Sequence, residues 1–135
     1  MKYTKLLFIV ALACLGACAT PARVVDYYDL PPSALQNLRG MAILHEQAVS
    51  EGGYTNLGIV TGFSCGRVPE DAANGGESEP RRKAIEQLKL NAAAMGAEHI
   101  TTPHCIVSDK IDFTNNCHAS ITCTGHALLQ VAAAP

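Results

Sequence analysis

Six cysteines in a chain of 135 residues constrain its fold more than any other feature of this sequence. In a small exported protein an even set of cysteines forms disulfides that restrain the chain, whereas cytosolic cysteines stay reduced or bind metal. The fate of these cysteines therefore depends on whether the chain leaves the cytosol, and the N-terminus bears on that question.

The N-terminus has the parts of a secretory signal peptide. Lys2 and Lys5 precede an apolar run, LLFIVALACLGACA, that extends from Leu6 to Ala19. A basic start, about 7–15 apolar residues and a small-residue end are typical of a signal peptide. The run is shorter than the ~20 apolar residues that a membrane-spanning helix needs. We therefore expect residues 1–17 to be removed.

The end of this run, LGAC at residues 15–18, resembles the lipobox of bacterial lipoprotein precursors. The resemblance implies cleavage before Cys18, lipidation of the Cys18 thiol and, because Ala19 follows instead of aspartate, sorting to the outer membrane. Several acyl chains anchor a protein durably. The alternatives are an ordinary signal peptide with an incidental cysteine, and a cut before Cys14.

Cleavage and lipidation leave four cysteines, which we expect to form two disulfides: Cys65, Cys105, Cys117 and Cys123. If Cys117 and Cys123 share one strand, they lie about 20 Å apart at ~3.3 Å per residue. A disulfide needs Cα atoms within ~7 Å, so these two do not pair with each other. Two pairings stay open: Cys65–Cys117 with Cys105–Cys123, or Cys65–Cys123 with Cys105–Cys117.

One helix is predicted with both of its ends marked. Pro80 suits the first turn of a helix, where its missing N–H costs nothing, and Gly96 suits the position just past a helix end. Apolar residues between them recur at helical spacing on one face, which we expect to be buried. They are Ala84, Ile85, Leu88, Ala92 and Met95.

Strands are expected over residues 41–46, 56–65, 98–108 and 117–131. In residues 56–65 an alternation predicts one buried face; its larger members are Leu57, Ile59, Thr61 and Phe63. Gly58 and Gly62 indicate close packing on the other face, and Pro103 marks an edge or a bulge. The order of elements predicts an α+β fold, a small mainly antiparallel sheet with one helix packed on a face.

The folded domain is expected to occupy residues 41–131. Residues 18–40 contain several prolines and little periodicity, so we expect a lipid-anchored tether with one short turn of helix over Ser33–Leu38. Residues 132–135 are expected to be a frayed tail. The net charge of −2 argues against nucleic acid as a partner.

Four segments resemble, in order, the RcsF-like family of outer-membrane lipoproteins. They are LGIVTGFSC (57–65), RRKAIEQLKLNAAAMGA (81–97), HCIV (104–107) and CHASITCTGHAL (117–128). The resemblance implies the disulfides Cys65–Cys117 and Cys105–Cys123, and a domain on the periplasmic side of the outer membrane. It also implies an envelope-stress sensor that engages an inner-membrane regulator, activates a phosphorelay and contacts outer-membrane barrel proteins. The alternative is a non-signalling structural, ligand-binding or metal-binding lipoprotein.

Positive charge gathers at the start of the predicted helix. Arg81, Arg82 and Lys83 stand in its first turn, where the helix dipole favours acidic residues. Together with Lys89 they form a candidate contact for an acidic partner protein or a lipid headgroup. The alternative is a solvated face with screened charge.

Cysteines and histidines between residues 104 and 126 suggest zinc, because sulfur and imidazole are its usual ligands. No Cys-x2-Cys or His-x3-His pair is present, and in a regular strand His104 and His118 point away from their neighbouring cysteines. We therefore expect no metal site. The sequence also lacks a serine-nucleophile, phosphate-loop or paired-carboxylate motif, so we expect no enzyme and no cofactor besides the lipid on Cys18.

Overall fold

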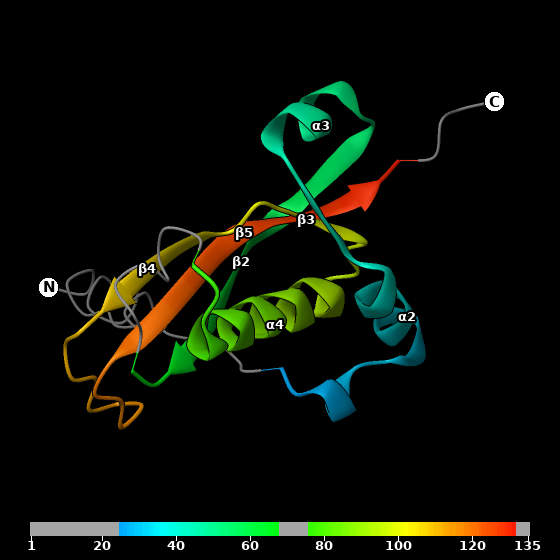
Figure 1. The fold of residues 1–135 in the computed structure, drawn as a ribbon. Coiled ribbons are helices and arrows are strands. Elements are labelled where there is room, and N and C mark those ends of the chain that lie inside the picture. Colours follow the sequence, from blue (N-terminus) through cyan, green and yellow to red (C-terminus); the bar gives the residue numbers. More distant parts are fainter. Residues whose placement is uncertain (1–24, 68–75, 132–135) are drawn as a thin grey trace, which may run out of the picture.

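The structure is a computed structural model that describes residues 25–67 and 76–131 (Figure 1). The predicted signal peptide, Cys18 and the tail at 132–135 lie outside these residues. The elements in chain order are η2 Tyr27–Asp29, α2 Pro32–Gly40, β1 Ala42–Leu44, α3 Glu46–Glu51, β2 Tyr54–Cys65, α4 Glu79–Ala94, β3 His99–Thr101, β4 His104–Ser108 and β5 Ser120–Gln130.

Strand β5 is the centre of a five-stranded sheet. Strand β2 pairs antiparallel with it along its whole length, from Tyr54 opposite Gln130 to Cys65 opposite Ser120. Strands β3 and β4 also run antiparallel to β5, and β1 adds to β3 in parallel. The sheet is therefore mixed but mainly antiparallel, with α4 packed across one face, which confirms the predicted α+β fold (Figure 1).

The strand predicted over residues 98–108 is divided at Thr102 and Pro103 into β3 and β4, both paired with β5. Pro103 has no N–H to donate to a neighbouring strand. The N–H of the preceding residue, Thr102, donates to the Leu44 carbonyl at 2.9 Å. The strand predicted over 41–46 is shorter, because α3 begins at Glu46.

The strand predicted to begin at residue 117 begins at Ser120, so the expectation that Cys117 and Cys123 share a strand is wrong. Cys117 instead forms an isolated bridge with Asp112, with N–H to carbonyl distances of 2.8 and 2.9 Å. Asn116 before it has φ +50°, a left-handed conformation that breaks an extended strand.

Pro80 and Gly96 stand at the two ends of α4, as the sequence predicted, and a cap from Ser78 adds to the first end. The Ser78 hydroxyl accepts the Arg81 N–H at 3.3 Å, and Pro80 stands in the first turn. At the other end the N–H groups of Gly96 and Ala97 bond back to Ala93 and Ala92, a Schellman motif with Gly96 at φ +84°. The predicted helix is therefore confirmed, with its start moved by one residue to Glu79.

The sheet lies so close to α4 because of Gly62. A Cβ at this position would collide with the Ala84 carbonyl and the Leu88 N–H and would lie 2.8 Å from Leu88 Cβ. The close packing predicted at Gly62 is therefore confirmed. The expectation that the larger residues of β2 form its buried face is wrong. Because α4 covers the side of Gly62, the smaller residues are buried, whereas Ile59 is 66% exposed and Phe63 38%.

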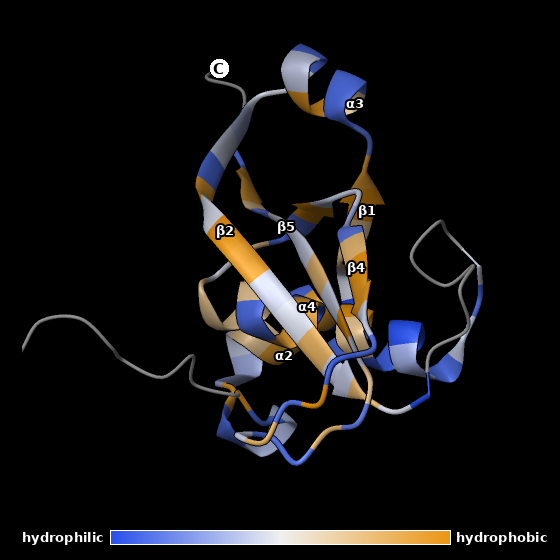
Figure 2. Ribbon diagram, turned by 90° about the vertical axis from the view of Figure 1, so that its left-hand side faces the viewer, coloured by the Kyte–Doolittle hydropathy of each residue, from blue (hydrophilic) through white to orange (hydrophobic). Residues whose placement is uncertain are grey.

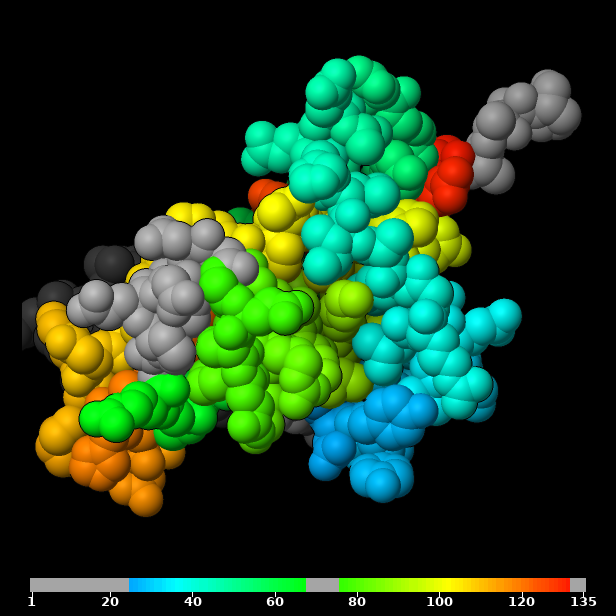
Figure 3. All heavy atoms as spheres, viewed as in Figure 1, coloured from blue at the N-terminus to red at the C-terminus, as the bar shows by residue number. Residues whose placement is uncertain are grey.

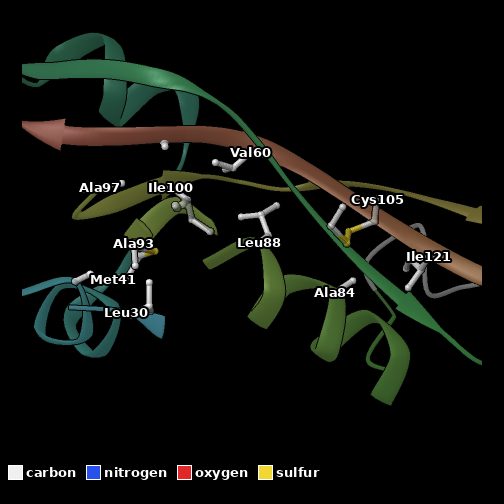
Figure 4. Packing of buried hydrophobic residues seen from close by; sticks show 14 residues of the cluster. Leu30, Met41, Val60, Ala84, Leu88, Ala93, Ala97, Ile100, Cys105 and Ile121 are labelled. Atoms are coloured by element: carbon white, nitrogen blue, oxygen red, sulfur yellow. A yellow bond between two sulfur atoms is a disulfide. The ribbon is translucent and has the colours of Figure 1, made fainter. Parts of the chain in front are cut away.

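The core lies between α4 and the sheet (Figure 4). Ala84, Leu88 and Ala92 are fully buried, as the helical spacing predicted. The other two predicted residues are not fully buried: Ile85 is half-buried, and Met95 is 44% exposed because it follows the last helical residue, where the chain turns away. Ala93 is buried in addition.

Part of the predicted tether belongs to the folded domain. Residues 25–40 contain η2 and α2, and the core includes Leu30, Ala34 and the adjoining Met41 (Figure 4). The prolines that suggested a tether include Pro32, which instead begins α2, a position where its missing N–H costs nothing.

Candidate functional site: disulfides and interaction surfaces

The structure contains two disulfides, Cys65–Cys117 and Cys105–Cys123. Their Cα atoms are 5.5 and 4.0 Å apart, within the reach of a disulfide. Of the two pairings left open by spacing, this is the one that the family resemblance implied.

The Cys105–Cys123 disulfide is part of the core. The two residues are directly opposite each other on β4 and β5. They are only 4% and 0% exposed and belong to the same buried cluster as Leu88 (Figure 4). This buried bond therefore cross-links the neighbouring strands β4 and β5.

The Cys65–Cys117 disulfide ties the end of β2 to the loop before β5. The Asp112 carboxylate organises that loop: one oxygen accepts the N–H groups of Thr114 and Asn115 at 2.9 and 3.2 Å, and the other accepts the Asn115 side-chain amide at 2.7 Å. These bonds, with that of the Asn115 side chain first, hold the pKa of the Asp112 carboxyl below its ordinary value. The loop thus presents Cys117, 1% exposed, to the sheet.

All four cysteines in the described residues are disulfide-bonded. Across residues 25–67 and 76–131, no three histidine, cysteine or acidic side chains gather as they would around a metal ion. His104 and His118 are exposed, next in sequence to the buried Cys105 and Cys117.

The predicted cations of α4 divide between its two flanks. Arg81, Arg82 and Lys89 line an open hollow of about 720 Å³, together with Glu77, Ser78, Glu79, Ile85 and Glu86. Lys83 lies instead against the edge of β2, in a second hollow that Phe63 helps to line. We call the first group of residues the α4 hollow.

Intrahelical pairs neutralise two of the four cations. The Arg82 guanidinium pairs with Glu86, and Lys83 Nζ lies 2.7 Å from a Glu79 carboxylate oxygen. The hydrogen bond from Lys83 lowers the pKa of the Glu79 carboxyl. All four side chains are more than half exposed, so each pair adds little stability.

The other two cations keep their charge unpaired within the described residues. Lys89 Nζ donates to the Met41 carbonyl at 3.4 Å, and the buried Arg81 Nε has no hydrogen-bond partner in the described chain. The lining of the α4 hollow therefore holds three cations and three carboxylates, Glu77 among them, and its unpaired cations are Arg81 and Lys89.

A second surface, which the sequence reasoning missed, is the face of the sheet opposite α4. Its cross-strand rows contain no charged side chain: Phe63, Thr122 and Ile106 in one, Thr61, Thr124 and His104 in the next, and Ile59 with His126 in the third. Ile59 and Ile106 are 66% and 63% exposed. Figure 2 looks onto β2 and shows the hydrophobic part of this strand.

No helix in residues 25–67 and 76–131 is long and apolar enough to cross a membrane. No protein-family model matches the chain, and no curated protein sequence matches it either. The functional proposal therefore depends on the residues themselves and on the geometry above.

Proposed function

We propose that the chain is a lipid-anchored outer-membrane protein that senses damage to the cell envelope and activates a phosphorelay by binding a protein partner. The observation that carries the proposal is the pair of disulfides in one small domain. Such bonds form and persist in oxidising compartments. The signal-peptide pattern and the lipobox at residues 15–18 support export to the same compartment.

The resemblance to the RcsF-like family supports the sensing role. It implied one of two pairings that spacing alone left open, and that pairing is the one present in the domain. By the same resemblance, the regulator is an inner-membrane protein, and outer-membrane barrel proteins are further partners.

The α4 hollow is the proposed contact with the regulator. Arg81 and Lys89 offer positive charge beside Ile85, so the matching surface on the partner carries carboxylates around an apolar side chain. An anchored protein meets its partner at a raised effective concentration, which allows a modest contact of this kind to work.

The test is an envelope-stress reporter in a strain that lacks the gene, complemented with variants. The wild-type gene should restore induction, and Cys18→Ala should not, because residue 18 would lack the thiol that takes the lipid. Arg81→Glu with Lys89→Glu should also abolish induction while the purified variant keeps its circular dichroism spectrum. Lys110→Glu, an exposed cation in the loop after β4, is the matched control and should leave induction unchanged.

The same strains separate the alternative function. If deletion leaves the reporter unchanged under envelope stress, the chain is a non-signalling structural or ligand-binding lipoprotein. If the double reversal on α4 signals normally, the proposed contact surface is refuted, but the sensing role is not.

A further inference from the structure

The first described residue is fixed against α4. The Val25 carbonyl accepts a hydrogen bond from Gln87 Nε2 at 3.0 Å, and the Val25 side chain packs against the buried cluster. Figure 3 shows the first described residues, in blue, at the surface on the side of the molecule that α4 occupies. The chain therefore joins the domain on its helical side, opposite the uncharged face of the sheet.

The link from this point to the lipid is short. Only residues 19–24 lie between Cys18 and Val25. At no more than ~3.6 Å per residue, the Cα atoms of Cys18 and Val25 are at most about 25 Å apart. With Cys18 lipidated, Val25 and its neighbours stay close to the surface of the bilayer.

Two exposed tyrosines stand at this same place. Tyr27 and Tyr28 form η2, and their rings meet edge to face at a centroid distance of 6.0 Å. Tyr28 is 90% exposed and Tyr27 42%, so neither serves the core. Tyrosine combines an apolar ring with a polar hydroxyl and is enriched at membrane–water interfaces.

We propose that η2 is a membrane-contact site, in which Tyr27 and Tyr28 enter the headgroup region of the bilayer that holds the lipid on Cys18. The inference rests on the lipid anchor of the proposed function. Asp26 and Asp29 flank the pair, so the contact is aromatic insertion and not the attraction of cations to anionic lipid.

The contact fixes the orientation of the domain. The end of the domain that carries Val25 and η2 lies toward the membrane. A regulator anchored in another membrane must then extend to the outer membrane, because the link does not let the domain travel toward it.

The absence of tryptophan from the sequence provides a clean probe. In the Tyr28→Trp variant the new indole is the sole one, and in the matched Phe113→Trp control it stands at a site that is 87% exposed in the loop before β5. Both full-length lipidated variants are reconstituted into vesicles of phosphatidylethanolamine and phosphatidylglycerol, with and without phospholipid brominated on its acyl chains.

The expected result is a blue-shifted emission of the Tyr28→Trp variant that brominated lipid quenches strongly, with little quenching of the Phe113→Trp control. Equal quenching of the two would overturn the membrane-contact site. The mass of the Cys18 peptide is measured on the same samples. A peptide without acyl mass would refute the anchor, whereas a lipidated protein with an unquenched Tyr28→Trp indole would refute the contact alone.

Discussion

The free energy of unfolding should depend differently, at the two disulfides, on whether alanine or serine replaces both cysteines. Loop-closure entropy alone favours the longer loop: a sequence separation of 52 for Cys65–Cys117 corresponds to about 4 kcal/mol, and one of 18 for Cys105–Cys123 to about 3 kcal/mol. Replacing both members by alanine should lower the free energy of unfolding by amounts of this order, with the longer loop costing more.

Serine should reverse that order because of where the sulfurs lie. Cys105 and Cys123 are 4% and 0% exposed inside the apolar cluster, so their hydroxyls would be buried where the wild-type core has no polar partner. Each buried serine hydroxyl should lower the free energy of unfolding by about 1–3 kcal/mol more than alanine does. Cys65 is exposed, and a hydroxyl at residue 117 has the Ala119 carbonyl within reach, since the Cys117 sulfur is already 3.2 Å from that oxygen.

The assay is guanidinium denaturation of the mature chain in a Cys18→Ala background, followed by far-ultraviolet circular dichroism. The serine pair at Cys105 and Cys123 should be the least stable of the four variants, and the serine and alanine pairs at Cys65 and Cys117 should agree to about 1 kcal/mol. Equal serine and alanine values at Cys105 and Cys123 would refute the buried position of that bond, and so would a larger serine penalty at Cys65 and Cys117.

Gly62→Ala should cost about 3 kcal/mol or more in urea denaturation, because its Cβ collides with the main chain of α4; Gly40→Ala, with open space around it, is the control and should cost nothing. Gly96→Ala should cost about 1–2 kcal/mol in the same assay, since φ is +84° there. The pKa of the Asp112 carboxyl is lowered in the folded protein, first by the hydrogen bond from the Asn115 side chain. The stability that the ionised carboxylate contributes is therefore complete above the ordinary aspartate pKa of about 3.9, and it is lost as the pH falls through the lower folded pKa. The stability difference between wild type and Asp112→Asn should therefore shrink on acidification; a difference that is constant with pH would contradict this.

Local chemistry made α4 predictable. Its ends depend on Pro80 and Gly96 and its buried face on the spacing of Ala84, Leu88 and Ala92, all of which act within the helix itself. Met95 escaped the pattern because periodicity does not reveal where the chain turns away.

What the sequence did not reveal depends on contacts between distant segments. Alternation in β2 shows that the two faces of the strand differ, but only the approach of α4 to Gly62 decides which face is covered. The same limit hid the exposed sheet face with Ile59 and Ile106. Cys117 was misplaced because the bonds of the Asp112 carboxylate, which end the extended chain, have no periodic signal.

The candidate contact on α4 was predictable as a set of charges but not as a surface. Arg81, Arg82, Lys83 and Lys89 are evident in the sequence, yet a helix turns successive residues to different sides. Lys83 is therefore separated from the other three, and the intrahelical acids Glu79 and Glu86 neutralise part of the charge.

The proposed anchor and the two disulfides together predict one signature, the mass of the mature protein purified from membranes without reduction. We predict an N-terminus at Cys18 that carries acyl groups, no free thiol, and two pairs of linked peptides, Cys65 with Cys117 and Cys105 with Cys123. An N-terminus without acyl mass, or free thiols at these four positions, would contradict an exported, lipid-anchored and disulfide-stapled sensor.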